Sequence, residues 1–220
     1  MFPWLGYLCF GVPTILLSLH TIIRIIRSFY KFPMPHVFAN LIDNPVRRKF
    51  QPPDATAVRH GIMPGMQVLE IGPGSGRYTL AAARRVGEDG KVVTVDIEPR
   101  IIEQVQRVID REGVENIEAR VADVYDLPFP DESFDLIYMI AVIGEIPDPK
   151  KAIDEFHRVL VPKGTLVFSE IFSDPDYPRV STILGWVGTE GYALKSQLGN
   201  FLYYTLIFEK QGSMNSRGIG

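Results

Sequence analysis

A glycine-rich turn directly after an apolar strand constrains this chain more than any other feature. Residues 68–79 read Val-Leu-Glu-Ile-Gly-Pro-Gly-Ser-Gly-Arg-Tyr-Thr, so an apolar run that holds one acid, Glu70, leads into Gly72, Gly74 and Gly76. Glycines at this spacing let the backbone turn sharply from strand to helix and let a ligand approach the main chain. Where the dinucleotide fingerprint has its third glycine this chain has arginine, which disfavours a nicotinamide cofactor. Glu70 offers an acceptor for an ammonium group, which favours a nucleoside that carries an amino acid.

Three further apolar segments follow the turn and alternate with helical stretches. They are Lys91–Asp96, Ile117–Val121 and Phe134–Ile140, and each is typical of a buried strand. This alternation predicts an α/β fold with a parallel sheet and right-handed crossovers. Ligands of such sheets bind outside the carboxyl ends of the strands, where the glycine turn would meet Asp96 and Asp123.

Five motifs in order carry a family resemblance. They are Glu70-Ile-Gly-Pro-Gly-Ser-Gly76, Val95-Asp96-Ile97, Ala122-Asp123, Leu127-Pro-Phe-Pro-Asp-Glu-Ser-Phe-Asp135 and Arg158-Val-Leu-Val-Pro-Lys-Gly164. From about residue 65 to 170 the chain resembles the class I S-adenosylmethionine-dependent methyltransferases, most closely the broad type 11 group. The resemblance implies a Rossmann-like, seven-stranded, mostly parallel sheet of order 3-2-1-4-5-7-6, with its last strand antiparallel and helices on both faces.

The resemblance also implies S-adenosylmethionine as cofactor and assigns residues to it. The glycine turn would hold the methionine part, Glu70 would lie near its amino group, Asp96 would bind the ribose and Asp123 the adenine amino group. Ile97 and Val124 would flank the adenine. The full set of expected cofactor residues is Glu70, Gly72, Pro73, Gly74, Gly76, Tyr78, Asp96, Ile97, Asp123, Val124 and Ile140. Asp96 and Asp123 are also typical of simple helix caps, which is an alternative for each.

Methyl transfer to an oxygen or an acidic carbon needs a base, whereas a neutral amine needs none. Glu145 follows the fourth strand at a position that faces the acceptor in the family, and His36 is the second candidate base. Glu145 could instead cap the helix that starts near Asp148. His157 is a weaker candidate base, and Tyr138, Glu170 and Tyr177 are weaker candidates for the lining of the pocket.

Composition excludes several function classes. The 220 residues have a net charge of −3 and a pI near 5.8, so no basic field for nucleic acid is expected. The single cysteine, Cys9, cannot form an internal disulfide, and no Cys/His cluster with metal-ligand spacing occurs. We therefore expect no metal, and the thiols of arsenite-methylating enzymes are lacking.

The N-terminal segment predicts contact with a membrane. Residues 2–23 carry no charge, Trp4 and Tyr7 stand near one end, and Arg24, Arg27, Tyr30 and Lys31 stand at the other as expected interfacial anchors. A single span would place the catalytic domain in the cytoplasm. An amphipathic helix lying on the bilayer, or a helix packed on the domain or on another subunit, is the alternative. The pattern of a cleaved signal peptide is not present.

The chain divides into four expected regions. Residues 1–30 form a membrane-anchor helix, 31–53 a proline-rich linker or lid, 54–210 the methyltransferase domain and 211–220 a disordered tail. The lid would offer His36, Asn40, Asn44 and Arg47 to the substrate, or else form a linker that meets anionic headgroups. Late in the domain we expect a helix from about Pro149 to Leu160, a fifth strand at 164–169, and a hairpin of 192–197 with 201–209 around Gly199-Asn200.

These features together predict a membrane-associated, S-adenosylmethionine-dependent methyltransferase that acts on a small lipophilic molecule. A phospholipid headgroup amine and an isoprenoid quinone are equal candidates. Ubiquinone and menaquinone methyltransferases share the Leu127–Asp135 stretch, but this chain departs from them after the fourth strand. A protein side chain or a soluble small molecule as acceptor, and a binding protein without turnover, are the alternatives. The sequence does not indicate an oligomeric state.

Overall fold

The computed structural model describes residues 14, 18, 21–24, 27, 51–188 and 191–212. The strands are β1 (Gln67–Ile71), β2 (Lys91–Asp96), β3 (Ile117–Val121), β4 (Phe134–Ile140), β5 (Leu160–Ile171), β6 (Tyr192–Asn200) and β7 (Tyr203–Lys210). The named helices are α4 (Pro53–Arg59), α5 (Arg77–Val86), α6 (Pro99–Glu112), α7 (Pro149–Val159) and α8 (Val180–Val187). The strands form one sheet in the order β3-β2-β1-β4-β5-β7-β6, which confirms the predicted order.

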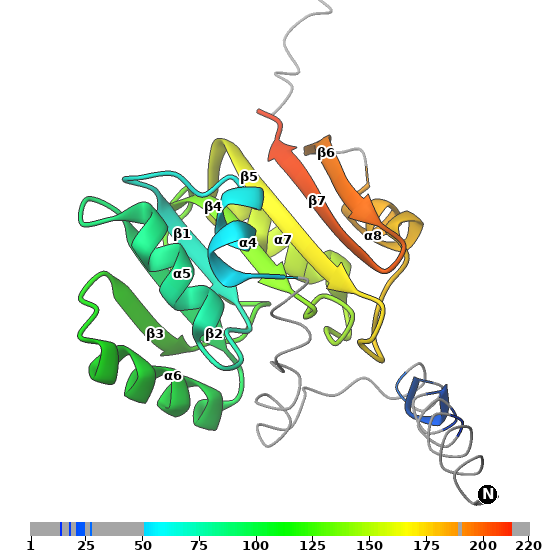
Figure 1. Cartoon of the computed structure of the whole chain (residues 1–220). Helices are drawn as coiled ribbons and strands as arrows, with labels where there is room; N and C mark the ends of the chain where they lie inside the picture. The colour runs from blue at the N-terminus through cyan, green and yellow to red at the C-terminus, as the bar shows by residue number, and fades with distance from the viewer. Residues whose placement is uncertain are drawn as a thin grey trace, which may run out of the picture.

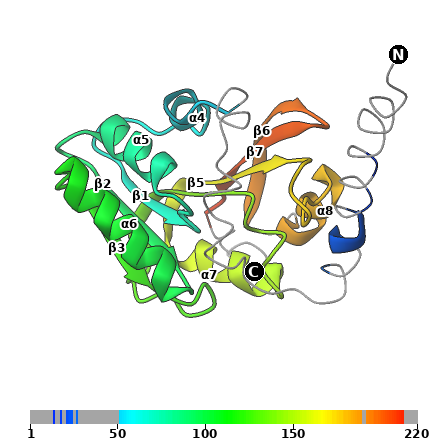
Figure 2. The same cartoon turned by 60° about the horizontal axis from the view of Figure 1, so that its bottom comes forward.

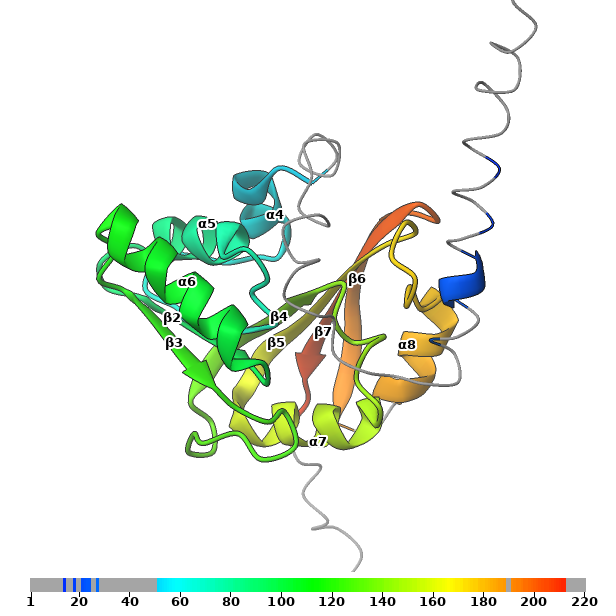
Figure 3. The same cartoon turned by 90° about the horizontal axis from the view of Figure 1, so that it is seen from below.

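The sheet is parallel from β3 to β5, and β7 enters it antiparallel between β5 and β6. Helices α4, α5 and α6 lie on one face, and α7 and α8 on the other (Figures 1 and 3). The strand order reverses between the neighbours β1 and β4, because β2 and β3 lie on one side of this pair and β5 to β7 on the other. Ligands of open α/β sheets bind at such a switch point.

The two faces of each central strand explain the two helical layers. Val68 of β1 belongs to a buried cluster with Ala82 of α5 and Val105 of α6, whereas Leu69 belongs to a cluster with Phe156 of α7. Successive side chains of a strand point to opposite faces, so a strand that is apolar at every position must be covered on both sides. The nearly continuous apolar runs of β1, β2 and β4 therefore require the three-layer fold.

Strands β2, β3 and β4 have the predicted bounds, but the predicted turn of the last hairpin is wrong. The turn is formed by Phe201 and Leu202, because Gly199 and Asn200 pair with Tyr204 and Tyr203 within the ladder. A Cβ on Gly199 would lie 2.2 Å from the carbonyl oxygen of Tyr203, so glycine is needed there for a close backbone approach. The Gly-Asn pair thus marks the last residues of β6 and not the turn itself.

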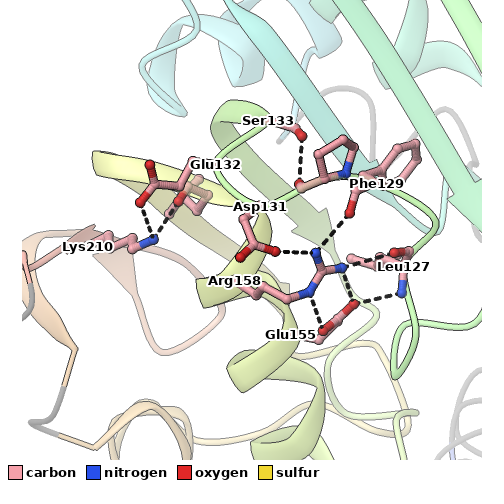
Figure 4. Close-up of polar contacts among 10 residues, drawn as sticks. Leu127, Phe129, Asp131, Glu132, Ser133, Glu155, Arg158 and Lys210 are labelled. Atoms are coloured by element: carbon pink, nitrogen blue, oxygen red, sulfur yellow. Dashed lines mark hydrogen bonds and ion pairs between the residues drawn. The ribbon is translucent and has the colours of Figure 1, made fainter.

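A hydrogen-bonded network around Arg158 holds the loop between β3 and β4 (Figure 4). Its guanidinium donates to the carbonyl oxygens of Leu127 (3.0 Å) and Phe129 (2.8 Å) and to the carboxylates of Asp131 (2.7 Å) and Glu155 (2.6 Å). Glu155 also accepts the backbone N–H of Leu127 at 2.8 Å. The two family motifs that contain Leu127 and Arg158 are therefore joined by contacts, and they fix the loop whose first residues reach the carboxyl edge of the sheet.

A second set of contacts joins the same loop to Lys210, the last residue of β7. The Lys210 ammonium donates to the carbonyl oxygen of Leu160 at 2.7 Å and lies 3.8 Å from a carboxylate oxygen of Glu132 (Figure 4). Ser133 closes the turn by donating to the carbonyl oxygen of Pro130 at 2.6 Å. The Pro-Asp-Glu-Ser turn is thereby held from both sides.

Replacing Arg158 by Met should lower the free energy of unfolding by about 2 to 4 kcal/mol, because two carbonyl oxygens and two carboxylates lose their donor. Urea denaturation would measure the change. Arg111 is the matched control: its exposed guanidinium pairs with Glu112 at 2.9 Å and with no other acid among the described residues, so Arg111→Met should cost no more than about 0.5 kcal/mol. Equal losses in the two variants would contradict a structural role of the network.

The N-terminal segment is described only in part. Residues 14, 18, 21–24 and 27 are helical, and none of the helices built from the described residues combines the length and apolarity needed to cross a bilayer. Most of the uncharged run 2–23, together with Tyr30 and Lys31, lies outside the described residues. The anchor assignment therefore stays a prediction.

Arg24 and Arg27 differ from the expectation, because they contact the domain. The Arg24 guanidinium donates to the carbonyl oxygen of Tyr177 at 2.9 Å and lies over the rings of Phe172 and Tyr177. Arg27 is only 4% exposed and pairs with Asp176. These contacts agree with the alternative in which the helix packs on the domain, at least for its last described turn.

Candidate active site

A cavity lies at the carboxyl ends of β1, β2 and β4, where the topology predicts a ligand site. All expected cofactor residues except Gly76 line it, and Gly76 directly precedes α5 beside it. The residues that line the cavity are Glu70 to Ser75, Tyr78, Val95 to Ile97, Ile101, Asp123 to Tyr125, Ile140 to Val142, Glu145 to Pro147, and Asp174. The fold thus brings together residues that are more than 100 positions apart in the chain.

The glycine turn forms the floor of this cavity. Gly72, Gly74 and Gly76 all have left-handed backbone, with φ of 72°, 53° and 78°. A Cβ on Gly72 would lie 2.6 Å from a methyl carbon of Val142, so that glycine serves the contact between the ends of β1 and β4. A Cβ on Gly74 would meet no heavy atom within 4 Å. The backbone at Gly74 is therefore accessible to a ligand, as the fit of an amino-acid-bearing nucleoside requires.

Glu70 lies under the turn and is almost fully buried. The hydroxyl of Thr79 donates to its carboxylate. Burial raises the pKa of Glu70, and the hydroxyls of Thr79, Tyr138 and Thr94 oppose that rise by smaller amounts. None of these neighbours is a cation. The site can therefore accept a ligand ammonium group, which would supply the missing positive charge.

Two acids follow the neighbouring strands. Asp96 ends β2 and accepts the N–H of Glu98 at 2.9 Å, while Asp123 accepts the N–H of Tyr125 at 2.9 Å in the turn after β3. The helix-cap alternative is wrong for both, because Glu98 caps α6 and no helix lies between β3 and β4. Burial raises the pKa of Asp96 to about 6, and the charge of Glu98 adds to the rise.

Tyr125 belongs to the cavity although the sequence analysis missed it. Its hydroxyl accepts the N–H of Asp148 at 2.8 Å, and the Lys151 ammonium lies 5.0 Å from its ring centre. Asp148 caps α7 by accepting the N–H of Lys151 at 3.2 Å, so the alternative that Glu145 caps this helix is wrong. Tyr125 thereby ties the loop after β3 to the start of α7.

Two acidic side chains from the loops after β4 and β5 line the cavity, and one of them contacts the N-terminal helix. Glu145 and Asp174 both line the cavity. Arg27 lies 3.7 Å from a carboxylate oxygen of Glu145 and also pairs with Asp176. The Glu145 side chain is 15% exposed, so its charge is balanced at close range by a buried arginine. The loops after β4 and β5 thus add two carboxylates to the lining of the cavity.

Several weaker candidates do not reach the cavity. His157 packs edge-on against Tyr192, with ring centres 5.3 Å apart, and Tyr138 packs against the buried His60. Glu170 and Tyr177 are also absent from the lining residues. His36, Asn40, Asn44 and Arg47 lie outside the described residues, so the lid assignment stays a prediction.

The remaining lining residues escaped prediction for two reasons. Most directly flank a predicted strand end or motif, where adjacency alone could have indicated them: Ser75, Val95, Ile101, Tyr125, Ala141, Val142, Ile146 and Pro147. Asp174 carries no such signal, because β5 extends to Ile171, two residues beyond the predicted strand end. That extension brings the following loop to the cavity.

The comparisons with known proteins agree with this geometry. A family model described as a methyltransferase domain matches residues 62–186, which is more than half of the chain. The chain therefore belongs to the methyltransferase domain family, and this membership identifies residues 62–186 as an S-adenosylmethionine-dependent methyltransferase domain. A crystal structure of such an enzyme from Aquifex aeolicus matches 81% of this chain and all of that chain, with a TM-score of 0.75 at 20% identity, and supports the fold.

Curated relatives differ in what they methylate. A ubiquinone/menaquinone biosynthesis C-methyltransferase of Hahella chejuensis is 39% identical over 128 residues, which cover 57% of this chain and 51% of the relative. An arsenite methyltransferase of Halobacterium salinarum is 32% identical over 115 residues, which cover 52% of this chain and 29% of the relative. The chain spans about half the length of the first relative and less of the second. The similarity therefore identifies the catalytic domain and does not determine the acceptor.

The raised pKa of Asp96 predicts pH-dependent cofactor binding. The ribose hydroxyls of the cofactor would donate to the ionised carboxylate, so the affinity should be full above the pKa of about 6 and should fall as the carboxyl is protonated below it. Between about pH 7.5 and about pH 5, the affinity should drop by up to about tenfold, as isothermal titration calorimetry would show.

Two variants test which carboxyl group causes this pH-dependent change in affinity. Asp96→Asn should bind about 1 to 3 kcal/mol more weakly near neutral pH and lose the step, since its side chain does not titrate. Glu70→Gln should keep the step near pH 6. A step that disappears in Glu70→Gln and persists in Asp96→Asn would assign the titration to the other carboxyl.

Arg27 should contribute strongly to the free energy of unfolding, although it lies outside the sheet. Arg27→Met removes a cation that pairs with two largely buried carboxylates and should lower the free energy of unfolding by about 3 to 5 kcal/mol. Adding Asp176→Asn should recover part of the loss, because the buried carboxylate that lost its ion pair with Arg27 is then replaced by a neutral amide. Urea denaturation of both variants measures this, and an unchanged midpoint in Arg27→Met would mean that the ion pairs do not form in solution.

Proposed function

We propose that this enzyme methylates a small lipophilic molecule at a membrane surface. The observation that carries the proposal is the uncharged run of residues 2–23, whose C-terminal end joins Arg24 and Arg27 on the acceptor side of the cavity. An acceptor that lies in a bilayer would meet the enzyme where the chain itself is most apolar. The similarity to quinone C-methyltransferases supports an isoprenoid quinone, and a phospholipid headgroup amine fits the same location.

The proposed cofactor contacts follow from the chemistry of the lining residues. S-adenosylmethionine supplies a methyl group on a sulfonium when bound. Asp96 would accept the ribose hydroxyls and Asp123 the adenine amino group, since carboxylates only accept hydrogen bonds. Ile97 and Val124 would flank the adenine, and Glu70 with the glycine turn would hold the amino-acid end. The cluster of apolar residues at Ile140 to Val142 would exclude water from the reacting end.

Glu145 is the proposed proton acceptor for an oxygen or carbon acceptor. It lines the cavity, and the Arg27 guanidinium lies 3.7 Å from one of its carboxylate oxygens. Asp174 is the second carboxylate in reach of the same space. A headgroup amine would need neither, because a neutral amine attacks without prior loss of a proton.

The decisive experiment incubates the purified enzyme with methyl-labelled S-adenosylmethionine and a whole-cell extract, then partitions the label between organic phase, protein precipitate and water. We expect the label in the organic phase. Asp96→Ala serves as the negative control, since it should reduce incorporation through weaker cofactor binding. Label in protein or in water would contradict a lipophilic acceptor, and no label would contradict turnover.

Glu145→Gln separates the two kinds of acceptor in the same assay. The substitution keeps the size of the side chain and removes its basicity. A loss of about a hundredfold or more in rate would support an oxygen or carbon acceptor such as a quinone precursor. An unchanged rate would support an amine acceptor.

A further inference from the structure

The turn between β6 and β7 exposes an unusual amount of apolar surface. Phe201 and Leu202 are each 61% exposed, more than any other large hydrophobic residue that the structure describes. Phe172, 37% exposed, stacks against Phe201 with ring centres 4.7 Å apart. We refer to Phe172, Phe201 and Leu202 as the apolar tip. All residues from 196 to 208 are uncharged, so no ionic group of the hairpin accompanies this surface.

The apolar tip is held rigidly by the domain. The Tyr177 hydroxyl donates to the carbonyl oxygen of Phe201 at 2.6 Å, and the N–H of Phe172 donates to that of Leu202 at 2.9 Å. The N–H of Leu202 donates to the side-chain oxygen of Asn200 at 2.9 Å. The turn therefore has most of its backbone polar groups satisfied by protein, and its exposed side chains extend from a fixed base.

Satisfied backbone groups matter because of where such a turn could go. A polar backbone group that enters an apolar phase without a partner costs several kcal/mol, which normally excludes loops from lipid. Here three of the four backbone groups of Phe201 and Leu202 already have partners. The tip can leave water with little loss of hydrogen bonding.

The apolar tip also lies beside the N-terminal helix. The Arg24 guanidinium is 5.6 Å from the ring centre of Phe172, and the preceding residues Ile22 and Ile23 are exposed. Figures 1 and 3 show the blue helical residues on the same side of the molecule as the β6–β7 turn, and Figure 2 shows them next to α8. The last described residues of the uncharged run, Ile22 and Ile23, are thus followed by an arginine that contacts the apolar tip, and the hairpin that carries the tip is itself uncharged from 196 to 208.

We infer that the apolar tip is a second lipid-contacting surface, which inserts into the headgroup boundary of a bilayer beside the N-terminal segment. The inference rests on the proposed membrane-associated function and adds a site to it. Aromatic and leucine side chains next to an arginine are the composition of interfacial anchors. The loop that holds the tip also carries Asp174, which lines the cavity. Insertion would therefore turn the acceptor end of the cavity toward the lipid.

An environment-sensitive dye at the tip tests this in the full-length protein. In a Cys9→Ser background, Leu202→Cys is labelled, and Leu194→Cys is the matched control because Leu194 is 45% exposed at the other end of the same hairpin. Each protein is mixed with vesicles of anionic and zwitterionic phospholipids that carry a quencher on the acyl chain. We expect a blue shift and quenching at 202 and neither at 194, while both proteins sediment with the vesicles.

Each other outcome overturns the inference in a distinguishable way. Sedimentation without a change at 202 would leave membrane association intact and remove the tip from it. Failure to sediment would overturn membrane association itself. A change at 202 that rises with protein concentration in the absence of vesicles would mean that a second copy of the chain covers the tip.

A substitution in the unlabelled protein gives an independent readout. Replacing Phe201 and Leu202 by Glu should weaken vesicle partition by about tenfold or more, whereas Leu194→Glu should leave it unchanged. Because the tip is exposed, cofactor affinity should stay the same in both variants, which verifies that the domain is folded. Equal partition of the tip variant and the wild type would overturn the inference.

Discussion

The left-handed backbone at Gly72 determines where everything else at the carboxyl edge of the sheet can lie. The chain leaves β1 at this residue with a φ of 72°, and Val142, which follows β4, occupies the place that a side chain would take. The ends of the two central strands can approach only because one of them lacks a Cβ. The cavity lies between the glycine turn, which begins at Gly72, and the loops after β2 and β3. A larger residue would alter both the shape of the site and the packing beneath it.

The second requirement is that the long connection between β3 and β4 keeps one conformation without a helix to stiffen it. Arg158, which belongs to α7 on the face opposite α5 and α6, meets that need. Its guanidinium donates to two carbonyl oxygens and two carboxylates. Part of the family resemblance therefore reflects architecture. The Leu-Pro-Phe-Pro stretch and the Arg158 motif hold the loop that brings Asp123 and Tyr125 to the cavity. Arg158 itself does not line the cavity.

The sequence predicted what depends on local pattern and failed where contacts are set by distant partners. The bounds of β2, β3 and β4 and the order of the sheet could be predicted, because apolar strands that end in acids and glycines carry their own signals. The hairpin turn could not, because the need for glycine at 199 comes from the approach of Tyr203 across the ladder. Likewise, nothing local indicates that Arg27 is buried or that Asp174 reaches the cavity. Both follow from how far β5 extends and from what packs against its end.

The position of Arg27 has a consequence for how this domain can vary. The positive charge that balances Asp176 and Glu145 comes from a segment outside the sheet, more than 100 residues earlier in the chain. We therefore expect the three positions to vary together, because a relative without the helix loses the contribution of this cation to both acids. Across homologous chains, acids at the two positions and a basic N-terminal helix should be gained or lost together. For the same reason, a fragment that starts after residue 27 is not equivalent to the catalytic domain of the whole protein.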